Sequence, residues 1–287
     1  MDQPSLESIL ADLNLPAIRF YSCIDSTNDE AIRWLDSGAP HLALILADEQ
    51  TAGRGRSRHR WVTSPGTALA FSLVLLSPPL DPHLLSRLTG LGAVAIQNAL
   101  GKKYNLSAQI KWPNDVLLDG CKVAGVLVEA RWNGDALFSA IIGIGINIAP
   151  QSVSAVNLPA TGLNFPATCV ENALGNPVDR LELLHAILQE LLTWLPRLSL
   201  PDFIHEWESN LAYRHQWVEL STDITAGDTS TPSSEKATPV QFEQGKLIGL
   251  TQDGSLKLLT ASGKMVVAAV GDIHLRPAAD HPILPTD

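Results

Sequence analysis

Two short apolar runs, residues 41–47 (HLALILA) and 68–76 (ALAFSLVLL), place the strongest constraint on the fold of this chain. A short continuous run of apolar residues, without polar alternation, is typical of a β-strand buried on both faces. Leucines and alanines at helical intervals in residues 82–100 and 178–195 indicate amphipathic helices. The sequence therefore predicts a sheet with flanking helices rather than an all-helical or all-strand protein.

Three further segments extend this main domain. Residues 25–36 are expected to begin a helix, because Thr27 and Glu30 have the spacing of a capping box ahead of apolar positions. Residues 122–130 and 137–148 are predicted strands, joined by a hairpin-type turn at 133–135. Pro196 is expected to end the helix at 178–195, because proline cannot continue the hydrogen-bond pattern.

The character of the sequence changes near residue 215. Residues 221–239 are rich in Ser, Thr, Asp, Gly and Pro, which predicts an exposed loop. Short apolar stretches punctuated by glycine turns lie around it, at 217–220, 246–250, 256–259 and 265–270. This spacing is typical of a small β-barrel or sandwich. We therefore predict a main domain at residues 1–215 and a small β domain at 216–287.

Composition excludes several classes of protein. With 45% hydrophobic residues, the chain has enough apolar material for a core and is not a disordered protein. Its formal net charge of −10 argues against general binding to nucleic acids or anionic membranes. No apolar run approaches the roughly 20 residues that a membrane-spanning helix needs, and the acidic N-terminus does not resemble a secretory signal.

The cysteines and histidines do not predict a structural metal site. Cys23, Cys121 and Cys169 lie far apart and form no CxxC pair, and no histidine pair has the spacing HxH or HxxxH. Scattered cysteines in odd number are typical of reduced thiols, so we expect a cytoplasmic protein.

A cluster of arginines is the first candidate for chemistry. The first 50 residues carry nine acidic residues and only two arginines, whereas residues 51–60 contain four arginines within GRGRSRHRW. Arginine binds phosphate with two parallel hydrogen bonds, and neighbouring glycines let an anion approach the backbone. A solvated basic loop is the alternative interpretation. The segment is not a P-loop, because GxxxxGK[ST] does not occur.

A second candidate is the segment KWPND at residues 111–115, followed by Lys122 and Gly125. Lysine suits phosphate, while carboxylate and amide oxygens suit Mg²⁺. The alternative is an ordinary turn, since Pro-Asn-Asp is common turn chemistry.

The third candidate is GIGIN at residues 143–147. It lacks the third glycine and the following helix of a dinucleotide fingerprint, so a Rossmann site is excluded. Glycines on a buried strand indicate instead a close approach by a ligand or by another backbone, or a packing constraint. The sequence contains no GxSxG and no other sign of a nucleophilic triad.

In this order and spacing, these segments resemble the catalytic core of biotin–protein ligases. The matching pieces are Ser26-Thr27-Asn28, residues 50–61, KWPND, the K-x-AG-x-L-x-E pattern at 122–129, and GIGIN. The resemblance spans about residues 19–215, and the tail is similar to the small SH3-like domain of that family. It implies an α+β fold, with a class II synthetase-like mixed sheet and flanking helices, followed by a small SH3-like β-barrel.

The resemblance also implies a reaction. Biotin and ATP would form biotinyl-5′-AMP with Mg²⁺, and biotin would then pass to a lysine of the biotin carboxyl carrier protein of acetyl-CoA carboxylase. This is the activity of a biotin–[acetyl-CoA-carboxylase] ligase. Both the biotin carboxylate and the triphosphate are anions, so the site needs cations that offset their repulsion.

Site residues are carried over from the family position by position. The expected catalytic residues are Lys122, Arg56 and Lys111. Those expected to bind biotin are Ser26, Thr27, Asn28, Gln50, Gly53, Arg54, Gly55, Trp112, Lys122, Gly125, Gly143 and Gly145. Those expected to bind ATP are Arg54, Arg56, Arg60, Trp61, Lys111, Asn114, Asp115 and Asn147. Asp115 is the expected Mg²⁺ ligand, and the segment near 160–161 is expected to fold over adenine.

One departure from the family pattern lies in the arginine loop, residues 53–61. The family usually continues GRGRxGRxW, whereas this chain has Arg58 and His59 in place of the glycine and the next arginine. Loss of a glycine stiffens a loop unless its dihedral angles suit the new residue. The sequence leaves open which arginine supplies the displaced charge and whether His59 makes the loop sensitive to pH.

Two other functions remain as alternatives. A lipoate–protein ligase or octanoyltransferase would share the lysine but is not expected to carry KWPND together with GRGR. A binding module that senses biotin or a nucleotide would not need Lys122, Arg56 and Asp115 together. Only 25 residues precede Ser26, so we expect no DNA-binding domain and no repressor function. The sequence leaves open whether a sheet edge pairs in a homodimer.

Overall fold

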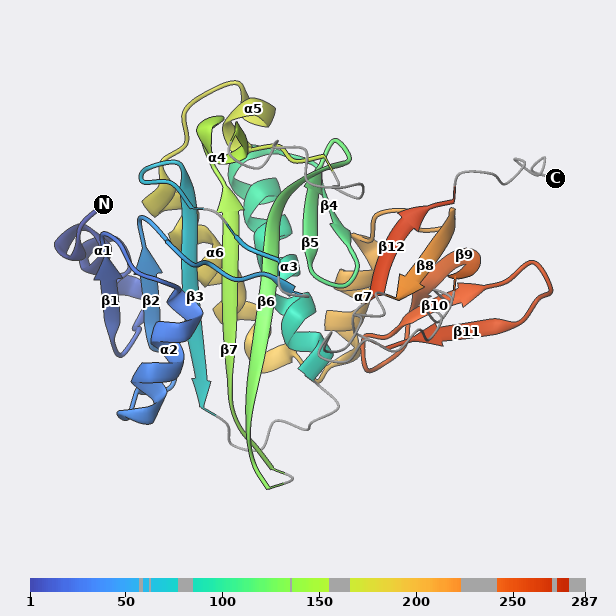
Figure 1. The fold of residues 1–287 in the computed structure, drawn as a ribbon, viewed down its shortest axis with the longest axis horizontal. Helices are drawn as coiled ribbons and strands as arrows, with labels where there is room; N and C mark the ends of the chain where they lie inside the picture. Colours follow the sequence, from blue (N-terminus) through green and yellow to red (C-terminus); the bar gives the residue numbers. More distant parts are fainter. Residues whose placement is uncertain are drawn as a thin grey trace, which may run out of the picture. The chain divides into compact units, whose positions relative to one another are not determined.

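The computed structural model describes residues 1–56, 59–61, 63–76, 85–134, 136–154, 166–222, 242–269 and 273–278. The chain divides into two compact units, Met1–Ala212 and Tyr213–Asp287. Figure 1 labels their helices and strands. Within the described part of the chain, no helix is both long and apolar enough to cross a lipid bilayer.

The first unit is built on a seven-stranded sheet of order β1-β2-β3-β7-β6-β5-β4. Only β1 and β2 pair in parallel, and every other neighbouring pair is antiparallel, so the sheet is mixed. The strands are β1 (Ile18–Tyr21), β2 (Leu44–Ala47), β3 (Ala68–Leu76), β4 (Ala108–Lys111), β5 (Asp115–Leu118), β6 (Cys121–Asn133) and β7 (Ala136–Asn147).

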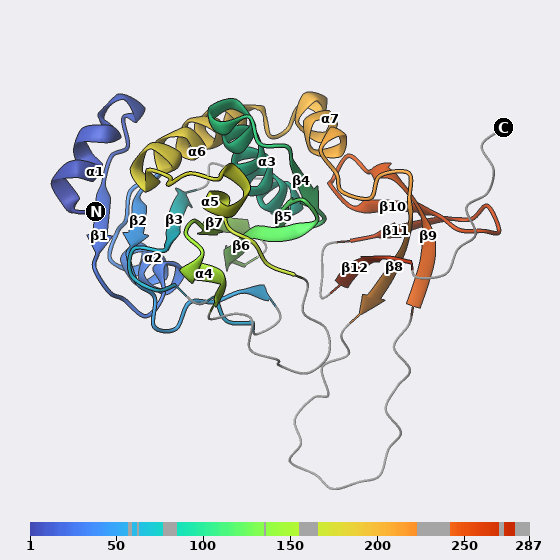
Figure 2. The ribbon, with the colours of Figure 1, turned by 90° about the horizontal axis from the view of Figure 1, so that it is seen from above.

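Helices cover both faces of this sheet. Helices α3 (Leu85–Tyr104) and α6 (Arg180–Trp194) lie side by side on one face, and α2 (Thr27–Asp36) lies on the other (Figures 1 and 2). The apolar runs of β2 and β3 therefore occupy covered positions, and β2 is buried at all four residues. The remaining helical segments are α1 (Gln3–Ile9), η1 (Ala11–Leu13), α4 (Gln151–Ser154), α5 (Val170–Leu174), η4 (Leu195–Arg197) and α7 (Pro201–Ser209).

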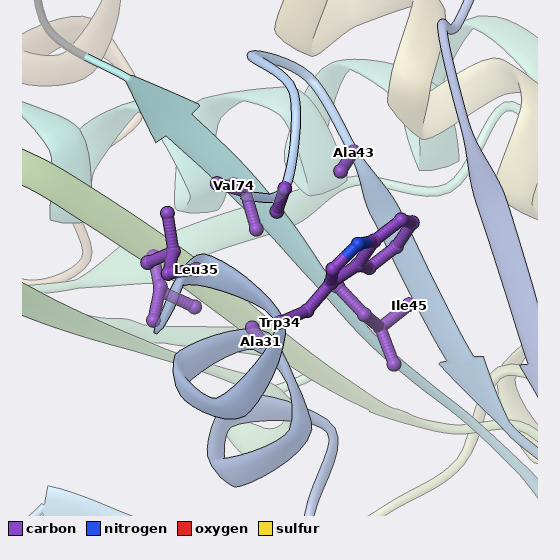
Figure 3. Packing of buried hydrophobic residues seen from close by; sticks show 8 residues of the cluster. Ala31, Trp34, Leu35, Ala43, Ile45 and Val74 are labelled. Carbon is purple, nitrogen blue, oxygen red and sulfur yellow. The ribbon is translucent and has the colours of Figure 1, made fainter. Parts of the chain in front are cut away.

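A compact apolar cluster holds α2 against the sheet (Figure 3). Trp34 and Leu35 of α2 pack on Ile45 of β2, Val74 of β3 and Ile141 of β7. Burial of side chains of this size contributes about 1.5–3 kcal/mol each. The cluster fixes the position of α2, whose N-terminal end then meets the middle of the sheet.

The mixed α+β architecture expected from the sequence is confirmed, and so is the hairpin of β6 and β7 with Gly134 at positive φ in its turn. The predicted capping box at Thr27 was wrong by one residue. The N-cap is Ser26, which has extended backbone angles and accepts a hydrogen bond from the Asp29 amide. Thr27 is instead hydrogen-bonded to Gln50 through both its amide and its hydroxyl.

Pro196 follows the end of α6, but it does not end the helical path at once. The chain continues as the short 3₁₀ turn η4, with the proline at one of its first positions, where no amide donor is needed.

The second unit contains an antiparallel five-stranded sheet of order β11-β10-β9-β8-β12. Its strands are β8 (Trp217–Thr222), β9 (Phe242–Leu250), β10 (Leu256–Leu259), β11 (Met265–Ala268) and β12 (Ile273–Pro277). This second antiparallel sheet is consistent with an SH3-like domain. The loop expected at 221–239 lies, from residue 223 onward, outside the described residues.

Candidate functional site

A pocket opens where the N-terminal end of α2 meets strands β6 and β7. It holds about 410 Å³ of space, part of it continuous with solvent. Three segments that are distant in sequence form its walls: residues 26–28, residues 125–127 and residues 143–145. Four further side chains complete the lining, from Gln50, Arg54, Trp61 and Asn114. The predicted loop, KWPND and GIGIN segments therefore meet at one place.

Glycines form one wall of the pocket. Gly125 of β6 and Gly145 of β7 are direct cross-strand partners, and the Trp61 indole lies over both of them. A Cβ atom on Gly145 would overlap this indole, and a Cβ atom on Gly143 would overlap the amide of Asn28. The glycines of GIGIN are thus required by the close approach of side chains from α2 and the arginine loop.

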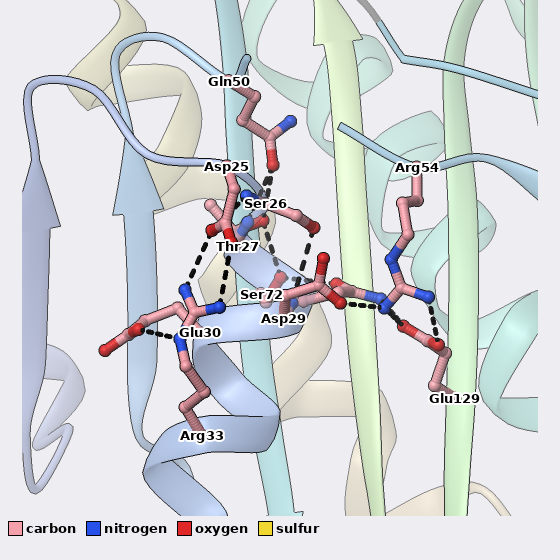
Figure 4. A network of polar contacts seen from close by, with 11 residues as sticks. Asp25, Ser26, Thr27, Asp29, Glu30, Arg33, Gln50, Arg54, Ser72 and Glu129 are labelled. Atoms are coloured by element: carbon pink, nitrogen blue, oxygen red, sulfur yellow. Dashed lines mark hydrogen bonds and ion pairs between the residues drawn. The ribbon is translucent and has the colours of Figure 1, made fainter. Parts of the chain in front are cut away.

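Beside this wall, polar groups of α2, β3 and Gln50 form a continuous chain of hydrogen bonds (Figure 4). The Oε1 atom of Gln50 accepts from the amide and the hydroxyl of Thr27, at 2.8 and 3.2 Å. The hydroxyl of Ser72, which is fully buried on β3, lies 2.8 Å from Thr27 Oγ1 and donates to Asn28 Oδ1 at 2.6 Å. These contacts fix the orientation of the Asn28 amide inside the pocket.

Arg54 lies between two carboxylates at the rim of the pocket (Figure 4). Its guanidinium donates to both oxygens of Glu129, at 2.9 and 2.6 Å, and lies 2.7 Å from Asp29 Oδ1. The same carboxylate of Glu129 accepts a hydrogen bond from Asn28 Nδ2 at 2.7 Å. Glu129 therefore contacts both Arg54 of the arginine loop and Asn28 of the pocket lining.

The KWPND segment forms the turn from β4 to β5. Lys111 and Trp112 are buried, and the Trp112–Pro113 peptide bond is cis. The Asn114 side chain accepts a hydrogen bond from Arg56 at 2.8 Å and donates to the Val126 carbonyl at 3.1 Å. The turn thus links Arg56 of the loop to strand β6.

Lys122 lies beside this turn. Its Nζ atom is 2.6 Å from Asp115 Oδ1 and 5.9 Å from the centre of the Trp61 ring. The ammonium is also close to Gly125, where a Cβ atom would come within 3.3 Å of it. Lys122 therefore lies next to the pocket wall without lining the pocket itself.

A second polar network lies at the N-terminal end of α2 (Figure 4). Arg33 donates to both oxygens of Asp25, at 2.9 and 2.8 Å, and to Glu30 at 2.9 Å. The hydrogen bond from Arg33 lowers the pKa of the Asp25 carboxyl below its ordinary value of 3.8. Because Asp25 precedes the N-cap Ser26, this network supports the end of α2 that enters the pocket.

Several predicted site residues have other contacts. Asn147 is buried and donates to the Thr168 carbonyl, and Arg60 donates to the Thr51 carbonyl. Gly53 and Gly55 belong to a small loop closed by backbone hydrogen bonds to Trp61 and His59. Arg58 and the segment at 160–161 lie outside the described residues.

Sequence reasoning missed Ser72 and Asp29 and gave Glu129 no role of its own. Ser72 had a visible signal, because it is the one polar residue in the run ALAFSLVLL. Asp29 had none, since an acidic residue in the first turn of a helix is common for reasons of the helix dipole.

The described residues contain no group of three or more His, Cys, Asp or Glu side chains that would hold a metal ion. Asp115 offers a single carboxylate close to the pocket. One protein carboxylate fits Mg²⁺, which usually keeps several waters and takes further oxygen ligands from a bound phosphate.

Comparison with known proteins gives consistent results. Residues 20–147 match the biotin/lipoate A/B protein ligase family. A biotin–[acetyl-CoA-carboxylase] ligase of Paracoccus denitrificans is 34% identical over 252 residues, which cover 85% of this chain and 95% of that protein. A bifunctional ligase/repressor BirA of Bacillus spizizenii is 30% identical over 243 residues, covering 84% of this chain and 72% of the relative.

A solved structure is also similar. The biotin protein ligase of Aquifex aeolicus, in complex with biotin and ATP, superimposes with a TM-score of 0.71 at 26% sequence identity. The similarity covers 92% of this chain and all of that one.

Proposed function

Because this chain belongs to the biotin protein ligases, within the biotin/lipoate A/B protein ligase family, we propose that it activates biotin with ATP and transfers it to a lysine of a carrier protein. The observation that carries the proposal is the pocket itself. Its glycine wall, its polar wall and its neighbouring Lys122 come from the motifs that the family shares, and they meet at one place.

In the first step, a biotin carboxylate oxygen attacks the α-phosphorus of ATP. A new O–P bond forms, the bond to the bridging oxygen breaks, and pyrophosphate leaves with biotinyl-5′-AMP as the other product. Lys122, Arg56 and Lys111 are the cations proposed to stabilise the charge on the phosphate oxygens. Catalysis then depends mainly on positioning and electrostatics.

The polar wall is suited to the ureido ring of biotin. Thr27 and Gln50 offer donors and acceptors at fixed positions, and the Asn28 amide is held by Ser72 and Glu129. A pocket that pairs each polar group of its ligand discriminates strongly against analogues that lack one. The apolar part of biotin is proposed to lie beside the Trp61 indole and the Asn28 amide, which pack on Gly145 and Gly143.

The nucleotide is proposed to lie on the side of Trp61 and KWPND. The buried indole N–H of Trp61 has no hydrogen-bond partner within the described residues, so it can donate to a bound ligand. Asn114 and Asp115 would face the phosphates together with Arg56. We propose that Asp115 holds Mg²⁺, which would neutralise part of the phosphate charge when bound.

In the second step, the amine of a carrier lysine attacks the acyl carbon of the adenylate. An amide bond forms, the bond to phosphate oxygen breaks, and AMP leaves. The proposed carrier is the biotin carboxyl carrier protein of acetyl-CoA carboxylase, in line with the names of relatives from Paracoccus denitrificans and Mycobacterium tuberculosis. The proposed location is the cytoplasm.

The test is biotin-dependent exchange of labelled pyrophosphate into ATP in the presence of Mg²⁺. Lys122→Ala is expected to lower the exchange rate about 100-fold or more, as removal of one charge-stabilising donor does in other enzymes. Lys264→Ala, on an exposed turn of the second unit, is the matched control and should leave exchange unchanged. Exchange with lipoate or octanoate in place of biotin would move the assignment to the related ligases. No exchange with any acid would indicate a binding protein.

A further inference from the structure

We propose that the carboxylates of Glu129 and Asp29 together bind Arg54 and thereby tether the arginine loop to the pocket. The proposal rests on the proposed function for its consequences, but the tether itself can be tested without any ligand. Glu129 is a positioning residue in this account, because it acts through Arg54 and Asn28 rather than on the substrate.

The contacts around Arg54 are specific in geometry. Two parallel hydrogen bonds join its guanidinium to the carboxylate of Glu129 on β6, and Asp29 on α2 lies 2.7 Å away. Bidentate arginine–carboxylate pairs are the strongest class of ion pair, because geometry and charge both contribute. Arg54 therefore links the loop to α2 and β6, two elements that contribute residues to the pocket lining.

The charge balance around Arg54 bears on its role. One guanidinium between two carboxylates leaves a local net charge of −1, which repels phosphate. We therefore assign Arg54 to holding the loop, whereas the family resemblance alone also assigns ATP to it.

Glu129 also connects Arg54 to Asn28, which lines the pocket. Its Oε2 atom accepts hydrogen bonds from both Arg54 and Asn28, at 2.6 and 2.7 Å. The Asn28 amide in turn lies against Gly143 and accepts from Ser72. A change in the charge of Glu129 would loosen the loop and weaken one of the two hydrogen bonds that hold the Asn28 amide. Both effects should weaken retention of a ligand in the pocket.

The experiment measures loop opening without any ligand. Trypsin cleaves after arginine, and the Arg56 carbonyl at the cleaved bond accepts a hydrogen bond from the His59 amide, so cleavage there requires this contact to open. Glu129→Gln and Asp29→Asn keep the side-chain shapes and remove the charges. Each is expected to raise the rate of cleavage after Arg56 about threefold to fivefold, the range for a partly exposed ion pair, and the double variant more. Asp202→Asn is the control, because it changes a carboxylate in another arginine ion pair, 2.7 Å from Arg197.

Two further readouts separate a tether from a general loss of structure. Arg54→Met should raise cleavage after Arg56 by a similar factor, and adding Glu129→Gln to it should have little further effect, since the pair is already broken. In biotin-dependent exchange, Glu129→Gln should raise KM for biotin several-fold with kcat nearly unchanged. The midpoint of thermal unfolding should stay within a few degrees of the wild-type value.

The outcomes are distinguishable from those of the proposed function. If the wild-type protein shows no exchange, the ligase proposal fails, while the trypsin measurement still decides on the tether. If Glu129→Gln and Asp29→Asn are cleaved at the rate of Asp202→Asn, the tether is overturned even when exchange is normal. Additive effects of Arg54→Met and Glu129→Gln would overturn it as well.

Discussion

The Oδ1 atom of Asp115 lies 2.6 Å from the Nζ atom of Lys122, across the neighbouring strands β5 and β6. The register of the two strands shifts between Val116 and Leu117. The shift therefore lies between Asp115 and Leu117, and Leu117 is the residue that pairs with Lys122. Both side chains are largely buried, with 16% of Asp115 and 30% of Lys122 exposed. The pair therefore holds the ammonium at a defined place beside the glycine wall.

Asp115 has two proposed tasks, holding Lys122 and holding Mg²⁺, and one substitution separates them. Asp115→Asn is expected to lower pyrophosphate exchange about tenfold to 100-fold, because it removes the carboxylate proposed to hold Mg²⁺ and the Lys122 ammonium beside the reacting anions. The measurement is the exchange rate as a function of Mg²⁺ concentration. If the carboxylate acts mainly on the metal, high Mg²⁺ should restore most of the rate. If it acts mainly on Lys122, the loss should persist at every concentration. An unchanged rate would exclude both tasks.

Gly143 is expected to tolerate no side chain. A Cβ atom there would overlap the Asn28 amide, which Ser72 and Glu129 hold in place. Gly143→Ala should therefore raise the Kd for biotin by at least about tenfold, the effect of about 1.4 kcal/mol. Isothermal titration calorimetry measures this directly. Gly101→Ala is the control, because the nearest atom to its Cβ would be 3.8 Å away. Wild-type affinity for Gly143→Ala would mean that Asn28 moves freely.

The architecture was predictable because its signals are local. The apolar runs of β2 and β3 and the helical spacing of α3 and α6 reflect burial along single segments. The short strands β4 and β5 lie within KWPND and its flanks, where turn residues obscure the pattern. They form because each pairs with a neighbour in the sheet, which no local signal reveals.

The candidate site was predictable only in part. Motif order brought Gln50, Asn114 and Gly145 to one pocket. The pairing of Arg54 with Asp29 and Glu129 was not predictable, because it joins residues 25 and 75 positions apart in the chain. Nothing in the sequence indicated that the Asn147 amide donates to the Thr168 carbonyl, 21 positions away, and contact of Asn147 with a nucleotide stays a prediction.

The hydroxyl of Tyr104, at the end of α3, is expected to lower the free energy of unfolding. Its hydroxyl is buried and has no hydrogen-bond partner within the described residues, and burial raises its pKa to about 12. Tyr104→Phe should raise the free energy of unfolding by about 1 kcal/mol at pH 7, since it removes an unpaired polar group. Because the hydroxyl ionises more easily in the unfolded chain, the advantage of the variant should grow as pH rises above 10. Urea unfolding at pH 7 and pH 10.5 tests both points, and a less stable variant would contradict the first.

Asp25 and Arg33 should make the stability of the α2 end depend on pH. The pKa of Asp25 is lower in the folded protein than its ordinary value of 3.8, because Arg33 donates hydrogen bonds to it. A depressed carboxyl pKa contributes stability above the ordinary value, and that contribution is lost as pH falls through the folded value. Because 46% of the Asp25 side chain is exposed, solvent screens its ion pair with Arg33. The pair should contribute only about 0.5 kcal/mol to the free energy of unfolding.

Asp25→Asn should accordingly lower the free energy of unfolding at pH 7, and the difference from wild type should shrink as pH falls below 3.8. Urea titrations from pH 7 to pH 3 measure it, in the wild-type and Arg33→Met backgrounds. With Arg33→Met, the same substitution should have little effect at any pH, since the favourable partner is gone. A difference that persists undiminished at pH 3 would contradict a contribution from the charge of Asp25.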